Sequence, residues 1–408
     1  MRILYFNYLY DTRGASLGSA IKPIELFRAL QERGHAVRLC WLKDEISGST
    51  GQGGRQGLPF RQALKRRFAR FVHDPKLLAE NLVFARREER QVRDFQPDLI
   101  VARHDLYVES FLHTARKYAL PLVVEADSPP LYEAMAFQKQ YWRIAALPRA
   151  IERKVLSSAD LVIAQSRELQ DYFIREHGLE PSRTAMVTNG ADPVLFQPQK
   201  RSADLMGQFG LHQGPVLGFV GSMNVWHGLD NLVQIMRAIL ERHANAQFLL
   251  VGAGGGAEEH IRRFAAESGF TDRVVFTGYI PYEQIPQIVQ LMDIVLAPYP
   301  DLPFFYYSPV KLFEYMAAGK PVVTTAIGQI EQVVRNNQTG LLCPAGRFDC
   351  IVQALEELLH NSNLRKRLGE NARREIETRH TWQHKAAEWE SLCRQLLNRP
   401  GKQADSVQ

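Results

Sequence analysis

The chain alternates short apolar runs with longer segments in which apolar residues recur at helical spacing. In the first half, the apolar runs predict strands at residues 3–6, 37–41, 99–101, 122–125, 161–164 and 184–187. Helical spacing predicts helices between them, including residues 21–33, closed by Gly34, and residues 106–118. This alternation is typical of a parallel sheet with helices on both faces.

The same alternation starts again after a stretch at 189–214 that contains proline and glycine. The second half predicts strands at residues 217–220, 248–251, 274–276, 294–297, 322–324 and 341–343, then helical segments over 351–398 and a frayed end at 399–408. We therefore expect an α/β protein with two doubly wound domains facing a central cleft, with ligands at the carboxyl ends of the strands. A length of 408 residues also favours two domains.

Composition narrows the class of protein. No apolar run approaches the roughly 18 residues of a membrane-spanning helix, and the apolar run at the start is too short for a signal peptide. The four cysteines form no C-x-x-C pair, which favours free thiols in a reducing compartment. We therefore expect a cytoplasmic protein.

The positive charge of the chain is local. Residues 61–93 hold ten basic and four acidic residues, an excess that equals the net charge of +6 of the whole chain. This favours contact with one anionic surface over nucleic-acid binding along the chain.

Within that basic segment, residues 60–72 have the pattern of an interfacial amphipathic helix. Phe60, Leu64, Phe68 and Phe71 share one helical face, and Arg61, Lys65, Arg66, Arg67 and Arg70 occupy the rest. The helix could dock on an anionic inner-membrane surface as a peripheral anchor. The alternative is a solvated helix that packs its aromatic face on the N-terminal domain.

The segment 308–323 holds the most informative pattern, a short helix followed by a buried strand. Ser308 is expected to be the N-cap, with the following proline in the first turn. Lys311 lies in that turn, where a cation is well placed only for an anion shared with the backbone N–H groups. Glu314 lies one turn later among apolar residues and needs donors such as sugar hydroxyls. Lys320, beyond the helix, is expected in solvent.

Three glycine-containing loops follow the first three strands of the second half, at 221–228, 252–256 and 278–281, and segment 308–314 follows the fourth. Loops that converge at one sheet edge suit a nucleoside diphosphate, because glycine lets the backbone approach phosphate. Each feature alone also has an ordinary explanation. The glycine loops could be plain turns, His227 could be a surface residue, and Lys311 and Glu314 could form an exposed ion pair.

Taken together in order, six segments resemble those of the GT-B-fold glycosyltransferases of family 4. They are residues 28–37 (RALQERGHAV), 159–166 (ADLVIAQS), 189–192 (NGAD), 276–279 (FTGY), 311–323 (KLFEYMAAGKPVV) and 369–373 (GENAR). The resemblance implies a GT-B fold of two Rossmann-like domains: an acceptor domain at 1–197, onto which a helix at about 381–398 packs back, and a nucleotide-sugar domain at 198–380.

The resemblance also implies roles for the residues at the donor site. Glu314 corresponds to the second glutamate of the family's E-x7-E motif and would bind the ribose, whereas Tyr306 stands where the first glutamate is expected. Ser222 and His227 stand where arginine and lysine are common, which leaves Lys311 to neutralise the diphosphate. Lys311 and Glu314 are thus the expected catalytic residues, and the remaining expected donor contacts are Gly221, Ser222, His227, Gly252, Gly254, Tyr279, Ile280, Tyr306, Ser308, Val310 and Leu312.

The first domain is expected to hold the acceptor. Arg103 follows one predicted strand, Glu125 ends another and Asp127 follows it, so their polar groups could hold acceptor hydroxyls. The alternative for Glu125 is that it caps the following helix. Gly14, after the first strand, could bring backbone close to the donor phosphate.

The resemblance implies a retaining glycosyltransferase that moves a sugar from a UDP or GDP sugar to a glycan or polyprenyl-linked glycan, in polysaccharide synthesis. The alternatives are a sugar-nucleotide epimerase of the same fold and a non-catalytic partner subunit that only binds the nucleotide sugar. We expect no cofactor and no metal, because the chain has no Asp-x-Asp pair.

Overall fold

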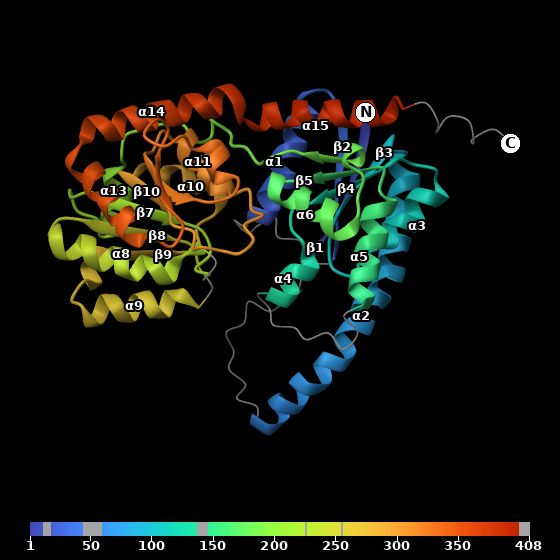
Figure 1. The fold of residues 1–408 in the computed structure, drawn as a ribbon, viewed down its shortest axis with the longest axis horizontal. Coiled ribbons are helices and arrows are strands. Elements are labelled where there is room, and N and C mark those ends of the chain that lie inside the picture. The colour runs from blue at the N-terminus through green and yellow to red at the C-terminus, as the bar shows by residue number, and fades with distance from the viewer. Residues whose placement is uncertain (11–17, 44–58, 137–145, 225–226, 254–255, 400–408) are drawn as a thin grey trace. The chain divides into compact units, whose positions relative to one another are not determined.

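The computed structural model describes residues 1–10, 18–43, 59–136, 146–224, 227–253 and 256–399, with backbone only at 9–10, 18–19, 43, 59–74 and 229–230. Its contacts divide the chain into two compact units. The first comprises Met1–Thr12, Phe27–Val187 and Ala387–Gln408, and the second comprises Arg13–Leu26 and Thr188–Ala386. Each unit is built on one six-stranded parallel sheet (Figure 1), so the expected α/β fold of two doubly wound domains is confirmed.

The first sheet has the strand order β2-β1-β3-β4-β5-β6. Its strands are β1 (Arg2–Tyr10), β2 (Ala36–Lys43), β3 (Leu99–Arg103), β4 (Leu122–Ala126), β5 (Leu161–Ala164) and β6 (Thr184–Met186). Its helices are α1 (Gly18–Glu32), α2 (Pro59–Phe95), α3 (Ser110–Lys117), α4 (Pro130–Ala136), α5 (Ala146–Ser158), α6 (Arg167–His177) and the 3-10 turn η1 (Pro181–Arg183). All six predicted strands of this half are present.

The second sheet has the order β12-β11-β10-β7-β8-β9. Its strands are β7 (Val216–Val220), β8 (Gln247–Val251), β9 (Val274–Gly278), β10 (Ile294–Ala297), β11 (Val322–Ala326) and β12 (Leu341–Pro344). Its helices are α7 (Ala203–Gln208), α8 (Leu229–Arg242), α9 (Ala257–Glu267), α10 (Ile285–Gln290), α11 (Val310–Ala317), α12 (Ile330–Val333), α13 (Phe348–His360) and α14 (Ser362–Arg379), with 3-10 turns η3 (Thr271–Arg273) and η4 (Tyr282–Gln284). The last helix, α15 (Trp382–Leu397), begins in the second unit and belongs to the first from Ala387 onward.

Alternate residues of the second sheet face two separate cores. Phe248 and Leu250 pack with α8, α9 and α13, whereas Leu249 and Val251 pack with α10, α11 and α14. A strand whose two faces are both covered consists of consecutive apolar residues, which is why the sequence shows runs here rather than polar alternation.

The order of the second sheet fixes where a ligand can bind. The chain starts at β7, moves outward to β8 and β9, and then crosses to β10 on the other side of β7. Loops that leave the carboxyl ends of β7 and β10 therefore diverge, and ligands of doubly wound sheets bind in the crevice that this creates.

Two helices differ from the sequence prediction. α3 was expected from residue 106, but it begins at Ser110. Asp105 accepts a hydrogen bond from the Leu106 N–H at its side chain, and Tyr107 has a φ of 61°, which a helix does not allow. The amphipathic segment at 60–72 is part of α2, a helix of 37 residues that continues through Pro75.

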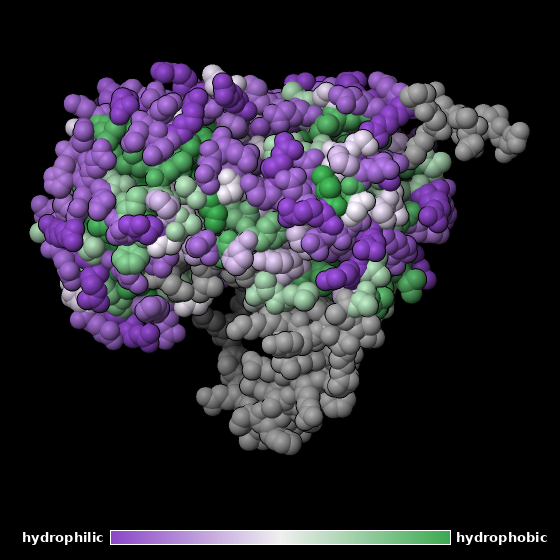
Figure 2. Space-filling model, viewed as in Figure 1, coloured by the Kyte–Doolittle hydropathy of each residue, from purple (hydrophilic) through white to green (hydrophobic). Residues whose placement is uncertain are grey.

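Hydrophilic residues dominate the described surface on the face shown in Figure 2, with hydrophobic residues scattered among them. In the described part of the chain, no helix is both long and apolar enough to cross a membrane.

Candidate functional site

Gly221 and Lys311 lie on the two sides of the switch in strand order, one after β7 and the other in the first turn of α11, beyond β10. A Cβ on Gly221 would lie 2.6 Å from the Lys311 Nζ, and its φ of 143° is also unfavourable for other residues. The φ of Gly221 therefore favours glycine at this position, and the absence of a Cβ lets the Lys311 ammonium come close to the backbone.

The ends of β7, β8 and β9 also lie against one another. The Gly221 N–H donates to the Val251 carbonyl at 2.9 Å, and the Gly252 N–H donates to the Gly278 carbonyl at 3.0 Å. A Cβ on Gly252 would lie 2.1 Å from the Gly221 carbonyl oxygen. The expected convergence of glycine loops is thus present, and it leaves backbone rather than side chains at this edge.

Lys311 carries its ammonium into this edge. Its Nζ is buried, lies 4.0 Å from the centroid of the Phe219 ring, and has no hydrogen-bond partner among the described residues. Burial lowers the pKa of Lys311 to about 7, although the Glu314 carboxylate opposes this shift. A buried ammonium without an acceptor costs free energy unless an anion joins it.

Glu314 is only 5% exposed, and no described residue hydrogen-bonds its Oε1. Burial raises the pKa of Glu314 to about 7. The Tyr282 hydroxyl and the Lys311 ammonium have the opposite, smaller effect on this pKa. Burial and the Glu314 charge in turn raise the pKa of Tyr282. The sequence analysis missed Tyr282, although it directly follows the 278–281 loop that was singled out.

Ser308 does not cap α11 as predicted. The N-cap is Pro309, and within the described structure no side chain caps this helix. The Ser308 hydroxyl instead accepts a hydrogen bond from the Asn189 N–H at 2.9 Å, and its carbonyl accepts from Asn189 Nδ2 at 2.5 Å. Ser308 thus ties the loop before α11 to the 189–192 segment.

Ser222 and His227 line the loop after β7. The Asn224 Nδ2 donates to the Ser222 Oγ at 2.9 Å, and the His227 N–H donates to the Asn224 carbonyl at 3.1 Å. Burial, with the Lys311 charge, lowers the pKa of His227 to about 2. The imidazole is therefore neutral at pH 7 and adds no cation to this loop.

The aromatic run before Ser308 divides into core and rim. Phe305 and Tyr306 are buried, whereas Phe304 and Tyr307 are partly exposed. The Tyr306 hydroxyl donates to the Tyr307 hydroxyl at 3.0 Å. Tyr306 is 0% exposed, so it packs in the core where the family places a carboxylate.

The remaining expected donor contacts differ in exposure. Tyr279 is 49% exposed and Ile280 is partly buried, at the loop after β9. Val310 and Leu312 are buried in α11. Gly254 lies outside the described residues.

The expected acceptor residues lie at the ends of β3 and β4. Arg103 Nη1 and Asp127 Oδ2 form a buried ion pair at 2.9 Å. Glu125 is fully buried and, with burial itself, raises the pKa of Tyr5. Gly14 lies outside the described residues, and contact of the other three with an acceptor stays a prediction.

Lys320 corrects another expectation, because it is not solvated. Its Nζ donates to the carbonyls of Gln290 and Met292 at 3.1 and 2.8 Å, at the end of α10. Burial lowers the pKa of Lys320 to about 8. Lys320 therefore ties the turn between α11 and β11 to the end of α10.

No group of three or more His, Cys, Asp or Glu residues in the described segments could hold a metal ion. The described side chains at the ends of β7 and β10 supply one buried amine, at Lys311, and one buried carboxyl, at Glu314.

Two family models match the two halves of the chain. "Glycosyltransferase Family 4" matches residues 23–195, and "Glycosyl transferases group 1" matches residues 214–361. The alpha-D-kanosaminyltransferase of Streptomyces kanamyceticus is 27% identical over 263 residues, which is 63% of this chain and 66% of that protein. The matches span about half to two thirds of the length of the curated relatives.

Solved structures share the fold. The sucrose-phosphate synthase of Thermosynechococcus elongatus superposes with a TM-score of 0.72 at 21% identity, covering 97% of this chain and 99% of that one. Anabaena HepE in complex with UDP-glucose superposes with a TM-score of 0.69 at 19% identity, covering 97% and 100%. These GT-B neighbours match both sheets described above.

Proposed function

Because this chain belongs to the glycosyltransferases of family 4, we propose that it transfers a sugar from a nucleoside-diphosphate sugar to a glycan or polyprenyl-linked glycan, with retention of configuration. The observation that carries the proposal is the pair formed by Lys311 and Glu314. Both present buried polar atoms that no described residue satisfies, at the switch in strand order where ligands bind.

The roles follow from charge. The Lys311 ammonium would neutralise the diphosphate, together with backbone N–H groups at the glycine turns. Glu314 would accept hydrogen bonds from ribose hydroxyls. As the bond to the sugar breaks, negative charge grows on the leaving phosphate, so a fixed ammonium beside it stabilises the transition state more than the ground state.

A uridine donor is the first to test, since the related fold of Anabaena HepE was solved with UDP-glucose. GDP sugars are the second choice. Transfer in polysaccharide synthesis at the inner face of a membrane would agree with the basic, aromatic pattern at 60–72, whose side chains lie outside the described structure.

The experiment is to incubate the purified chain with a panel of UDP and GDP sugars, with and without oligosaccharide or polyprenyl-phosphate acceptors. Nucleotide release and a mass increase of the acceptor by one sugar support the proposal, and NMR of the new anomeric centre tests retention. Glu314→Gln is the inactive control. Conversion of the sugar to an epimer without acceptor would identify an epimerase instead.

A second candidate, a non-catalytic subunit that binds a nucleotide sugar, is favoured by two observations. Tyr306 is fully buried where the family has a glutamate, and the pKa of His227 is lowered to about 2, so His227 supplies no cation at the position of the usual lysine. Tight donor binding without transfer, hydrolysis or epimerisation would select this candidate.

A further inference from the structure

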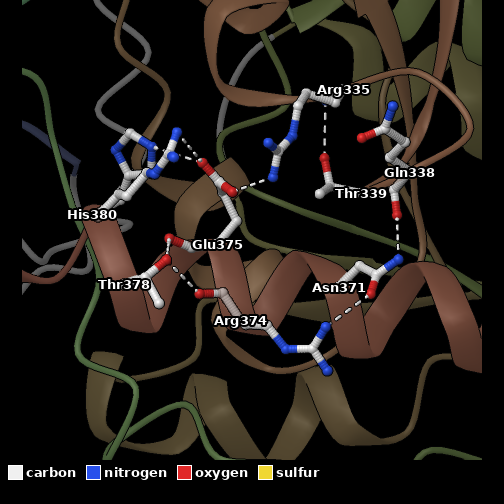
Figure 3. A network of polar contacts seen from close by, with 9 residues as sticks. Arg335, Gln338, Thr339, Asn371, Arg374, Glu375, Thr378 and His380 are labelled. Carbon is white, nitrogen blue, oxygen red and sulfur yellow. Dashed lines mark hydrogen bonds and ion pairs between the residues drawn. The ribbon is translucent and has the colours of Figure 1, made fainter.

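A polar cavity of about 280 Å³ lies between the turn at residues 335–339 and one face of α14 (Figure 3). Its volume is at the lower end of the roughly 300–1,000 Å³ typical of small-molecule sites. The α14 residues that line it fall on one helical face at spacings of three and four: Asn371, Arg374, Glu375, Thr378 and Arg379.

The charge of the lining is positive. Arg335, Arg374 and Arg379 contribute three guanidinium groups, and Glu375 is the one carboxylate among the residues that line the cavity. The nearby His380 adds no charge at pH 7, because burial and surrounding cations lower its pKa to about 4. The lining therefore carries two uncompensated positive charges.

Glu375 organises two of the arginines. It is 9% exposed and forms ion pairs with Arg335 and, at 3.5 Å, with Arg379 Nη1. Sharing one carboxylate leaves each guanidinium with further donors, since a guanidinium carries five N–H groups. Among the described residues, the hydrogen bond of the Arg374 guanidinium goes to an amide oxygen, Asn371 Oδ1, at 3.4 Å.

The walls are held in place by the network drawn in Figure 3. The Arg335 N–H donates to the Thr339 hydroxyl at 2.8 Å, and the Asn371 Nδ2 donates to the Gln338 carbonyl at 3.0 Å. The first bond closes the turn on itself, and the second, with the Arg335–Glu375 ion pair, joins the turn to the helix. The cavity is therefore formed before a ligand binds.

This cavity is separate from the site at Lys311. The 335–339 turn leads directly into the amino end of β12, whereas the glycine loops follow the carboxyl ends of β7, β8 and β9. In a parallel sheet these are opposite edges.

We propose that this cavity is a second anion site that binds a small phosphate monoester of about the size of a hexose phosphate. Guanidinium groups are suited to phosphate because their paired N–H donors match two phosphate oxygens. The amide and hydroxyl groups of Gln338, Asn371 and Thr378 would contact a polar, uncharged remainder such as a sugar.

The test is isothermal titration calorimetry of the full chain at low ionic strength with glucose 6-phosphate. Glucose, which lacks the phosphate, is the uncharged control ligand. Glucose 6-phosphate should bind and glucose should not. The exposed double variant Arg374→Gln/Arg379→Gln should weaken binding by about tenfold or more, because two charged donors are lost. Arg262→Gln, on α9 outside the cavity, is the matched control and should bind as the parent does.

Two further variants separate this site from the donor site. Lys311→Met should leave glucose 6-phosphate binding unchanged, and Glu375→Gln should tighten it several-fold by removing the one negative charge of the lining. Absence of binding, equal binding of glucose, or loss of binding in Lys311→Met with retention in the double arginine variant would overturn the proposal.

Discussion

Lys311 and Glu314 lie one turn apart on α11, with the Lys311 Nζ and the Glu314 side chain buried, yet within the described structure they form neither an ion pair nor a hydrogen bond with each other. Two opposite charges this close on a helix would be expected to pair if nothing else required them. Burial moves the pKa of each to about 7, which favours the neutral form of both. A bound phosphate would favour the charged form of Lys311, and hydroxyl donors would favour the charged form of Glu314, so each group is suited to a different part of a ligand.

Glu314→Gln is expected to weaken nucleotide binding and to lower kcat/KM by about ten- to a thousand-fold, the loss of one or two charged hydrogen bonds of about 1.5–3 kcal/mol each. Titration with UDP and GDP and steady-state kinetics measure this. The matched control is Glu283→Gln on the exposed rim of η4. Unchanged kinetics in a folded Glu314→Gln protein would exclude the carboxylate from the site.

Lys311→Met is expected to reduce activity without reducing stability, whereas Lys320→Met is expected to reduce stability. Lys311 is a buried ammonium without an acceptor, so its removal should abolish most turnover while leaving Tm unchanged or raised. Lys320→Met leaves the carbonyls of Gln290 and Met292 unsatisfied, at about 1–3 kcal/mol, so it should lower Tm. Steady-state kinetics and thermal melts of both variants test this expectation. A lowered Tm with retained turnover in Lys311→Met would show that Lys311 has a structural role.

The protons taken up or released when nucleotide binds at pH 7 should distinguish the role of Lys311 from that of Glu314. A bound diphosphate raises the pKa of Lys311 from about 7, so the lysine takes up protons. Hydrogen bonds from ribose lower the pKa of Glu314 from about 7, so the carboxyl releases protons. Nucleotide titrations in buffers of different ionisation enthalpy should therefore show net uptake in Glu314→Gln and net release in Lys311→Met.

In the parent chain the two effects oppose each other, so the net proton exchange should lie between those of the variants. If net proton exchange on nucleotide binding had the same sign in both variants, Lys311 would not contact the phosphate while Glu314 contacts the ribose.

Activity is expected to survive EDTA, because the chain has no Asp-x-Asp pair and the Lys311 ammonium is available to the diphosphate. Initial rates are compared in EDTA, in Mg²⁺ and in Mn²⁺. A requirement for added metal would transfer the role of neutralising the leaving group from Lys311 to that ion.

The basic, aromatic segment at 60–72 is expected to bind anionic vesicles. Each basic residue near acidic lipid contributes about 1 kcal/mol, so its five could give reversible binding. Leu82 and Val83, later on α2, are 71% and 46% exposed, which adds apolar surface to the same helix. Co-sedimentation should require anionic lipid and fall with salt.

Replacing Lys65, Arg66, Arg67 and Arg70 by Ser should reduce vesicle binding, whereas replacing four basic residues of α14 (Arg365, Lys366, Arg367 and Arg374) should not. Binding that ignores salt, or no binding, would leave the segment as an ordinary solvated helix.

The sequence predicted the strands well, because a strand covered on both faces is an apolar run that any reader of the chain can find. The sequence did not predict the surroundings of residues whose hydrogen-bond partners are distant in the chain. Ser308 has the right residue type for an N-cap, but its hydroxyl is bound by Asn189, 119 residues earlier. Lys320 looks like a solvated residue until the carbonyls at the end of α10 are brought to it.

The donor residues were found from their position after strands, which is a local signal. Tyr282 was missed because only tertiary structure places its hydroxyl near Glu314. The start of α3 was misplaced because apolar spacing does not reveal the positive φ of Tyr107.

Gly221 has a φ of 143°, a backbone conformation that other residues rarely adopt, so a library randomised at 221 alone should return glycine. The Lys311 Nζ would lie 2.6 Å from a Cβ at 221, but it is the end of a flexible side chain and can move away. A shorter residue at 311 would therefore not rescue a substitution at 221. Donor preference is expected to diversify through the surrounding loops, while the glycine is retained whatever residue stands at 311.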